Sequence, residues 1–95
     1  MELRTLRYFL TTADEGNITR AAHILHVTQP TLSRQLMELE RELGTVLIVR
    51  GKKGVTLTDD GMLFRQRAEE IVELADRAEK HFVERAKNVS GIDSI

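Results

Sequence analysis

Residues 21–36 constrain the fold of this chain more than any other segment, because they predict two helices joined across a short break at residues 26–28. Several signals mark the start of the second helix. Thr28 can act as its N-cap by accepting a hydrogen bond from a backbone N–H of the first turn. Pro30 then falls at the second helical position, where its missing N–H costs little. Two helices that meet across so short a break are typical of a helix-turn-helix, whose second helix usually enters the major groove of DNA.

The second helix of this motif separates an apolar side from a polar side. At about 100° per residue, its leucines form one stripe that should face a core: Leu32, Leu36, Leu39 and Leu43. Arg34 lies opposite this stripe, near the helix N-terminus, where its guanidinium can meet a guanine edge or a phosphate. The candidate DNA-contacting residues at this end are Thr28, Gln29, Pro30, Thr31, Ser33 and Arg34. The same pattern also fits an amphipathic surface helix with a solvated arginine, so the neighbouring segments must decide.

Length and composition limit the chain to one small domain with an extension. Its 95 residues are 41% hydrophobic, too few for two independent cores. The chain has no cysteine, which excludes disulfides and thiolate metal sites and fits a reducing compartment. No apolar run approaches the roughly 18 residues that a membrane span needs, and the sequence after Met1 lacks the apolar core of a secretory signal. We therefore expect a cytoplasmic protein without membrane contact.

The charges are distributed unevenly along the chain. The formal net charge is −1, which by itself argues against a nucleic-acid partner. However, residues 1–58 contain eight Lys and Arg against six Asp and Glu, whereas residues 59–95 contain six against nine. A mildly basic N-terminal part is therefore joined to an acidic C-terminal part. If the chain binds DNA, binding must depend on where the cations stand rather than on bulk charge.

Two further helices should precede the recognition helix. Apolar residues recur at helical spacing over residues 3–14, and Gly16 follows as a glycine does just past a helix end. Thr19 can cap the next helix, expected at about residues 19–25. No glycine stands in the break after it, so we expect His26 to adopt the left-handed conformation, which histidine tolerates better than most residues.

A β-hairpin should follow the glycine, Gly44, that ends the second helix of the motif. The β-branched runs 46–49 and 55–57 flank a loop bounded by glycines, which is typical of two short paired strands. The cations in or beside its tip are Arg50, Lys52 and Lys53. Next to a helix-turn-helix, such a hairpin over about residues 46–57 is a wing, whose cations can reach phosphates or the minor groove. By itself, the same segment also fits a solvated polar loop.

A long final helix is predicted over residues 59–88. Thr58 can cap it, and the acidic residues that follow favour the positive end of its dipole. Apolar residues fall on a 3-4 repeat typical of a coiled-coil seam, which only Arg85 interrupts: Gly61, Phe64, Ala68, Ile71, Ala75, Ala78, Phe82 and Val89. Self-association along this seam is the natural interpretation, with docking onto another domain as the alternative. Residues 89–95 are expected to begin a linker or hinge.

Taken together, these segments follow the sequence pattern of one protein family in order. The matching stretches are Leu6, Phe9 and Leu10, then Gly16-Asn17-Ile18-Thr19-Arg20-Ala21-Ala22, Leu25, Gln29-Pro30-Thr31-Leu32-Ser33, Leu39-Glu40, Leu43-Gly44, Leu47, Arg50, and Leu57-Thr58 with Gly61. Over residues 1–89 the chain resembles the LysR-type transcriptional regulators. It departs from their usual pattern at Ile48, where the family usually has Phe, and at Asn17-Ile18, where it usually has Ser-Phe.

The resemblance implies a mainly α fold, a winged helix-turn-helix of three helices and a two-stranded β-hairpin, followed by a long dimerisation helix. The helix-turn-helix would span about residues 18–37, within a DNA-binding domain of residues 1–58. Double-stranded DNA is the implied partner, with the recognition helix around the major groove and the wing cations along the backbone or minor groove. The family also implies a homodimer, with a tetramer as an option for the full-length protein. It further implies a small-molecule effector for a domain absent from this chain, and no cofactor in this chain.

Other function classes have weaker support in the sequence. His23 and His26 are three residues apart, but no third ligand indicates a metal site, and no motif indicates an enzyme. The loop Gly51-Lys52-Lys53-Gly54 matches the GXXG loop of KH-type RNA binders, but that loop should join two helices and strand-like runs flank it here. The remaining alternative is a protein-interaction module that dimerises through the long helix without binding specific DNA.

Overall fold

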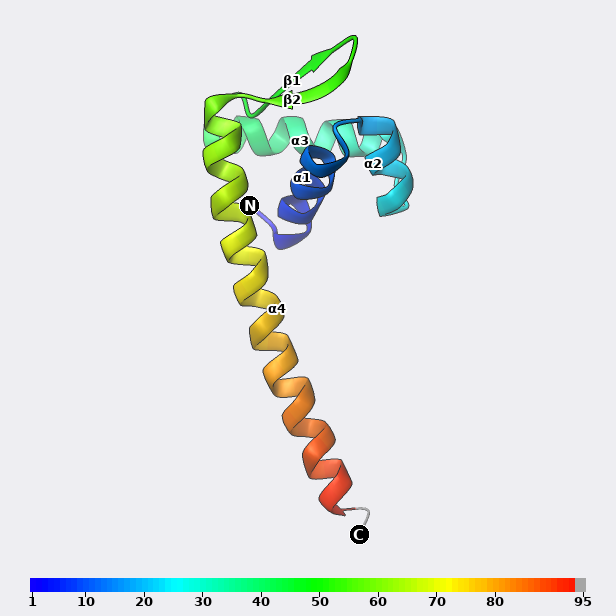
Figure 1. Cartoon of the computed structure of the whole chain (residues 1–95), viewed down its shortest axis with the longest axis vertical. Helices are drawn as coiled ribbons and strands as arrows, with labels where there is room; N and C mark the ends of the chain where they lie inside the picture. Colours follow the sequence, from blue (N-terminus) through cyan, green and yellow to red (C-terminus); the bar gives the residue numbers. More distant parts are fainter. Residues whose placement is uncertain (94–95) are drawn as a thin grey trace.

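Three helices, a β-hairpin and a long fourth helix follow one another in the described part of the chain. The computed structural model describes the backbone of residues 1–93 and the side chains of residues 1–87. The elements are α1 (Leu3–Glu15), α2 (Ile18–Leu25), α3 (Gln29–Leu43), β1 (Ile48–Gly51), β2 (Gly54–Leu57) and α4 (Asp59–Asp93). Residues 1–58 form the head, a helical bundle covered by the hairpin, and α4 leaves it as a long rod (Figure 1). The mainly α winged helix-turn-helix that the sequence predicts is confirmed.

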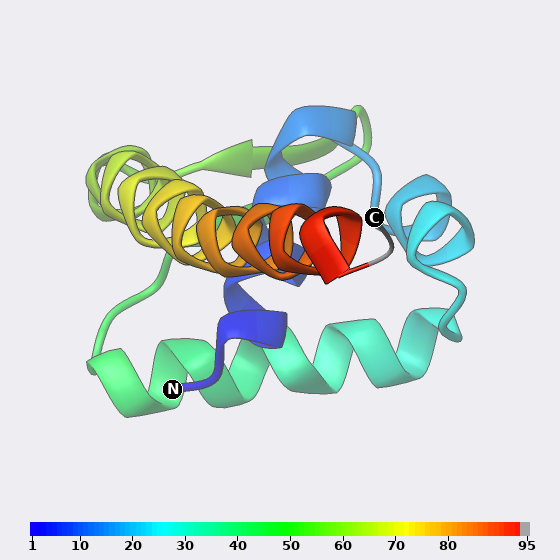
Figure 2. The same ribbon diagram turned by 90° about the horizontal axis from the view of Figure 1, so that it is seen from below.

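The core of the head lies where the first three helices meet beneath the hairpin. In the view of Figure 2, α3 and the hairpin lie at opposite edges of the head and α1 passes between them. The buried apolar side chains of the head are Leu6, Phe9, Ala21, Ala22, Leu32, Leu36, Leu39, Leu47 and Ile48. Three of the four leucines predicted to line the inner side of α3 are therefore buried, whereas Leu43, at its last turn, is 39% exposed. Their burial leaves the opposite, polar side of α3 facing solvent.

The ends of α1 and α2 are fixed by backbone caps. α1 ends at Gly16, whose φ of 63° is left-handed. The N-cap of α2 is Asn17, whose Oδ1 accepts a hydrogen bond from the Arg20 N–H at 2.8 Å. The prediction that Thr19 caps α2 was wrong, because the helix already begins at Ile18, which makes Asn17 the N-cap and places Thr19 inside the first turn. His26 has a φ of 58°, so the predicted left-handed break between α2 and α3 is confirmed.

The start of α3 has the predicted capping arrangement. The Thr28 hydroxyl oxygen accepts a hydrogen bond from the Thr31 N–H at 3.3 Å, and the Thr28 hydroxyl donates to the Thr31 hydroxyl at 2.8 Å. Pro30 lies in the first turn, and Gly44 ends the helix with a φ of 71°. The helix-turn-helix is therefore formed by α2 and α3, joined through His26 and Thr28.

The hairpin is antiparallel and begins later than the sequence predicts. Its register pairs Ile48 with Leu57 and Gly51 with Gly54, so β1 starts at Ile48 rather than at Val46. The backbone of the two preceding residues bonds elsewhere, because the Thr58 hydroxyl donates to the Val46 carbonyl at 2.6 Å and the Thr58 N–H donates to the Leu47 carbonyl at 3.0 Å. The strand pairing therefore starts only after these two residues.

The first part of α4 packs on the head instead of forming an open seam. Gly61 is buried against the backbone of Leu47, and Phe64 packs edge-on against Phe9 of α1 with ring centroids 5.3 Å apart. Ala68 is fully buried. The head of the same chain buries Gly61 and Ala68 and packs against the half-buried Phe64, so these three predicted seam positions face the head, and their part in a dimerisation seam stays a prediction. A 3-4 repeat requires a partner surface, and α1 and the hairpin base supply it here.

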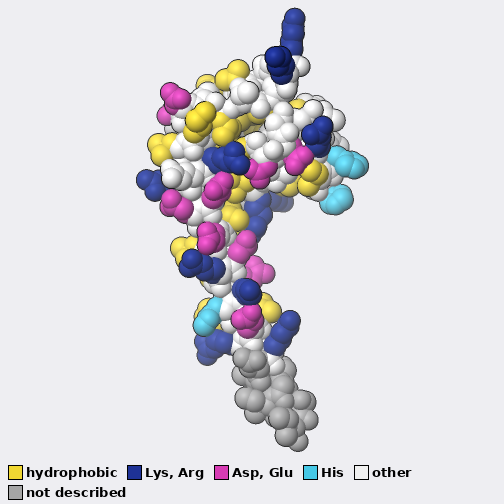
Figure 3. Space-filling view, viewed as in Figure 1, with side chains coloured by type: hydrophobic (Ala, Val, Ile, Leu, Met, Phe, Trp, Pro, Cys, Tyr) yellow, Lys and Arg dark blue, Asp and Glu magenta, His cyan; other side chains and the backbone are white. Residues whose placement is uncertain are grey.

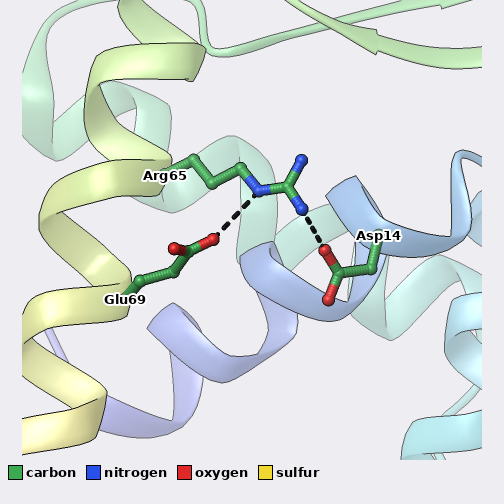
Figure 4. A network of polar contacts seen from close by, with 3 residues as sticks. All are labelled: Asp14, Arg65 and Glu69. Atoms are coloured by element: carbon green, nitrogen blue, oxygen red, sulfur yellow. Dashed lines mark hydrogen bonds and ion pairs between the residues drawn. The ribbon is translucent and has the colours of Figure 1, made fainter.

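Ion pairs flank this contact between α1 and α4. Arg65 of α4 donates to Asp14 of α1 and, through its Nε at 3.1 Å, to Glu69 of its own helix (Figure 4). Farther along, Arg7 of α1 lies 2.6 Å from Asp76, and this hydrogen bond lowers the pKa of the Asp76 carboxyl. Exposed pairs of this kind add little stability. They mark the length of α4 that lies along α1.

Beyond this contact α4 extends away from the head. Of the remaining predicted seam residues, Ala75 is half-buried, whereas Ile71, Ala78 and Phe82 are exposed. The side chain of Val89 lies outside the described residues. The backbone of α4 stays helical to Asp93, so the prediction of a helix end near residue 88 and a hinge from residue 89 was wrong for residues 89–93. This stretch contains a glycine but no proline, and an interior glycine costs only about 1 kcal/mol relative to alanine. Residues 94–95 of the predicted hinge lie outside the described residues.

Candidate nucleic-acid interface

The outer side of α3 presents polar groups near its N-terminus. Thr28, Gln29, Pro30 and Arg34 are exposed, whereas Thr31 and Ser33 are half-buried. Among the described side chains, the Arg34 guanidinium forms no ion pair, so its donors point to solvent. An arginine in this state loses no internal partner when it binds a base edge or a phosphate. All six residues that the sequence proposes for this helix end are therefore brought together.

The cations of the hairpin stand at the same end of the head as the start of α3, but on the other side of it. Arg50 stands in β1, and Lys52 and Lys53 form the tip between the paired glycines Gly51 and Gly54. All three cations are exposed, and basic side chains project at the hairpin end of the molecule in Figure 3. The hairpin tip and α2 both extend away from the start of α4 (Figure 1). The predicted wing cations therefore stand where they can meet a polyanion together with α3.

A groove of about 320 Å³ separates the wing from the start of α2. The residues that line it are Asn17, Ile18, Thr19, Arg50, Gly51, Lys52, Lys53, Gly54 and Val55. The wing side of this groove is cationic and the α2 side carries the first turn of a helix, whose dipole favours anions. The lining of the groove therefore includes residues of both the wing and the helix-turn-helix, and none of them is acidic.

Three contacts from the head and α4 fix the base of the hairpin, and sequence reasoning missed them. The Val55 N–H donates to the Gly16 carbonyl at 2.9 Å, which joins β2 to the end of α1. One carboxylate oxygen of Glu40 accepts from the N–H groups of Leu47 and Ile48. The Thr58 hydroxyl, which caps α4 by accepting from the Gly61 N–H at 2.9 Å, provides the third contact through the hydrogen bonds already described. No pattern in a single sequence indicates these partners, because each bond joins two different elements whose relative position is set only when the chain folds.

Two other kinds of site find no support in the described part of the chain. Within it, no group of three or more His, Cys, Asp and Glu side chains could hold a metal ion, so His23 and His26 have no third ligand. None of the helices described here combines the length and apolarity needed to cross a bilayer.

Comparison with known proteins decides the family. The family model described as "Bacterial regulatory helix-turn-helix protein, lysR family" matches residues 3–62. The chain belongs to the LysR family. It is 49% identical over 92 residues to the HTH-type transcriptional regulator BsdA of Bacillus subtilis, a match that covers 96% of this chain and 32% of BsdA. The chain thus corresponds to about a third of the length of that transcriptional regulator.

Solved structures of LysR-family DNA-binding domains on DNA have the same fold. The crystal structure of the CbnR_DBD-DNA complex superposes with a TM-score of 0.84 at 43% identity, covering 90% of this chain and 99% of that chain. The BenM_DBD/catB site 1 DNA complex superposes with a TM-score of 0.86 at 41% identity, covering 90% of this chain and 97% of that one. The LysR-type DNA-binding fold that the sequence resembles is therefore confirmed over both the head and α4.

Proposed function

We propose that this chain is the DNA-binding part of a transcriptional regulator, with α3 in the major groove and the wing on the backbone or minor groove. The observation that carries the proposal is the shared end of the head where the polar start of α3 and the cationic wing both face solvent. Similarity to two LysR-family domains solved on DNA supports it. A regulator of bacterial genes works where the chromosome is, so we propose a cytoplasmic location.

A salt-dependent mobility-shift assay tests this function directly. The probes are a duplex recovered by the wild-type chain from a random-sequence pool and a mixed-sequence duplex of equal length. Specific regulators bind their site on the order of 10³–10⁷-fold more tightly than other DNA. Failure to shift either duplex at low salt would instead favour the interaction-module alternative, in which α4 dimerises and the head binds protein.

Arg34 should contribute base readout. Its exposed guanidinium stands in the second turn of α3 and has the bidentate geometry that suits a guanine edge. We expect Arg34→Ala to cost on the order of 1–3 kcal/mol on the recovered duplex and much less on the mixed-sequence duplex. Titration of both duplexes in parallel measures the difference. Equal losses on both would show that Arg34 contacts only phosphate.

Lys52 and Lys53 should contribute to DNA affinity without a preference for sequence. They are exposed point charges at the hairpin tip, so we expect them to neutralise phosphates. Replacing both with alanine should weaken binding to both duplexes alike and lower the slope of log affinity against log salt by about one to two units. The measurement is a salt titration of each duplex. An unchanged slope would mean that the two lysines are solvated and do not contact DNA.

We also propose that the chain forms a homodimer through the exposed side of α4, and that two heads together read an interrupted inverted repeat. At about 100° per residue, five exposed apolar residues of α4 fall on one stripe about 100° wide, which excludes the exposed Met62 and Val83: Leu63, Ile71, Leu74, Ala78 and Phe82. Three residues of this stripe belong to the seam predicted from sequence, and Leu63 and Leu74 replace Phe64 and Ala68. Leu74 is 66% exposed and Phe82 is 63% exposed, which leaves a large apolar area without a partner in the described chain.

For the rest of the regulator, membership of the LysR family is the only support. Since this chain matches only 32% of BsdA, we propose that a further domain binds a small-molecule effector and that the full-length protein can assemble into a tetramer. No cofactor is proposed for the residues of this chain. A direct test is to express the full-length protein that contains this chain and measure its DNA affinity and its mass in solution with and without candidate small molecules.

A further inference from the structure

Glu40 connects the recognition helix to the start of the wing through its side chain. Its Oε2 accepts a hydrogen bond from the Leu47 N–H at 2.7 Å and another from the Ile48 N–H at 3.2 Å. Glu40 is half-buried and stands on α3, whereas Leu47 and Ile48 are buried at the point where β1 begins. Among the described hydrogen bonds, these two are the only ones in which a side chain joins α3 to the hairpin.

The chemistry of this link makes it stiff. A carboxylate that accepts backbone N–H groups forms charge-assisted hydrogen bonds, which are shorter and stronger than neutral ones. Removing the acceptor would leave two N–H groups of buried residues without this partner, and an unsatisfied buried donor is costly. The same helix carries Arg34 less than two turns earlier, on its solvent side. Because α3 is rigid, it fixes the position of Arg34 relative to the base of the wing.

We propose that Glu40 is a positioning residue that sets the wing relative to the recognition helix, so that the wing lysines and Arg34 reach the same DNA together. The role rests on the proposed function, because it needs a duplex on which both surfaces act. If the link is cut, Lys52 and Lys53 keep their charges and the hairpin base keeps its contacts with Gly16 and Thr58, but the wing loses its side-chain connection to the helix that carries Arg34. Their contacts with phosphate should then weaken even though both lysines remain.

A double-mutant cycle tests this role. Glu40→Ala is combined with the double replacement of Lys52 and Lys53 by alanine, and all four chains are titrated with the recovered duplex over a range of salt. We expect Glu40→Ala alone to weaken binding about tenfold and to lower the salt slope as the lysine replacements do, but to change little when those lysines are already absent. Additive losses, or an unchanged salt slope, would show that Glu40 does not act through the wing.

Matched variants separate positioning from charge and from folding. Glu42→Ala removes the same charge from the same helix, where Glu42 pairs only with the exposed N-terminal amino group at 2.9 Å, and it should bind without loss. Glu40→Gln keeps a carbonyl oxygen that can accept both N–H groups, so it should restore most of the affinity. Glu40→Asp keeps the charge but is one methylene shorter, so it should resemble Glu40→Ala. Wild-type behaviour of both Glu40→Asp and Glu40→Ala would overturn the proposal.

Amide hydrogen exchange of the DNA-free chain provides a second readout that does not depend on the operator. Glu40→Ala should accelerate exchange at Leu47 and Ile48 more than at the amides of α1, whereas Glu42→Ala should not. Uniform acceleration would indicate general destabilisation and would overturn the specific role of Glu40. If the wild-type chain binds neither duplex, the proposed function fails, whereas additive losses with intact wild-type binding overturn the role of Glu40 alone.

Discussion

Replacing Gly61 with alanine should destabilise the chain, although helix propensity alone predicts the opposite. Alanine in a helix interior is about 1 kcal/mol more favourable than glycine. However, a Cβ at position 61 would collide with the carbonyl oxygen of Leu47 and would lie 3.0 Å from its carbonyl carbon and 3.2 Å from the Leu57 Cβ. The backbone of Leu47 cannot move aside as a flexible side chain can. The cost of overpacking should therefore exceed the gain in helix propensity, with a net loss of about 2–3 kcal/mol in the free energy of unfolding. The sign of the effect is therefore the test.

Thermal unfolding at one fixed protein concentration measures this effect. For a domain of this size, the expected loss lowers the melting temperature by roughly 10 °C or more. Gly51→Ala is the matched control, since a Cβ there meets nothing closer than the Gly54 carbonyl oxygen at 3.9 Å. We expect this control to melt close to the wild type. A higher melting temperature for Gly61→Ala would mean that α4 does not lie this close to the hairpin base.

Replacing Leu74 with glutamate should abolish the proposed dimer while leaving the head folded. Leu74 lies on the exposed stripe of α4, with no part of the head over it. If two stripes meet, the variant places an unpaired carboxylate in each interface, which should cost about 3–5 kcal/mol of association. Tight binding to the inverted repeat should be lost with it, because each head would then bind a half-site alone.

Sedimentation of the wild-type and variant chains checks this prediction. Val83→Glu is the matched control, because Val83 is 48% exposed on the other side of the same helix and receives the same charge. The control should remain dimeric. A monomeric wild-type chain, or a Leu74→Glu chain that stays dimeric, would exclude this stripe as the interface.

Phe64→Ala should have a different effect, because it removes the contact with Phe9 and should therefore destabilise the head.

Local signals in the sequence were sufficient to predict the helix-turn-helix and the position of its charges. The cap at Thr28, the left-handed His26 and the glycines that end α1 and α3 each depend on residues within one turn of themselves. The candidate DNA-contacting residues of α3 follow from these caps and from the leucine stripe, because the caps fix where α3 begins and the buried leucines fix which side of it faces solvent. Thr19 was the exception, since two neighbouring residues could both cap α2 and Asn17 does so.

The sequence by itself therefore determined the order of elements, the recognition helix, the cationic wing tip and the family. Only the tertiary structure decided what covers each apolar surface and what holds the wing. The 3-4 repeat of α4 specifies a stripe but no partner, and Phe64 and Ala68 are covered by the head rather than by a second chain. The late start of β1 and the bonds of Glu40 have the same origin, because each depends on how the chain turns between α3 and β1 and not on residues within one helical turn. The periodicity of a sequence predicts which side of a helix is apolar, whereas the tertiary structure determines which surface buries that side.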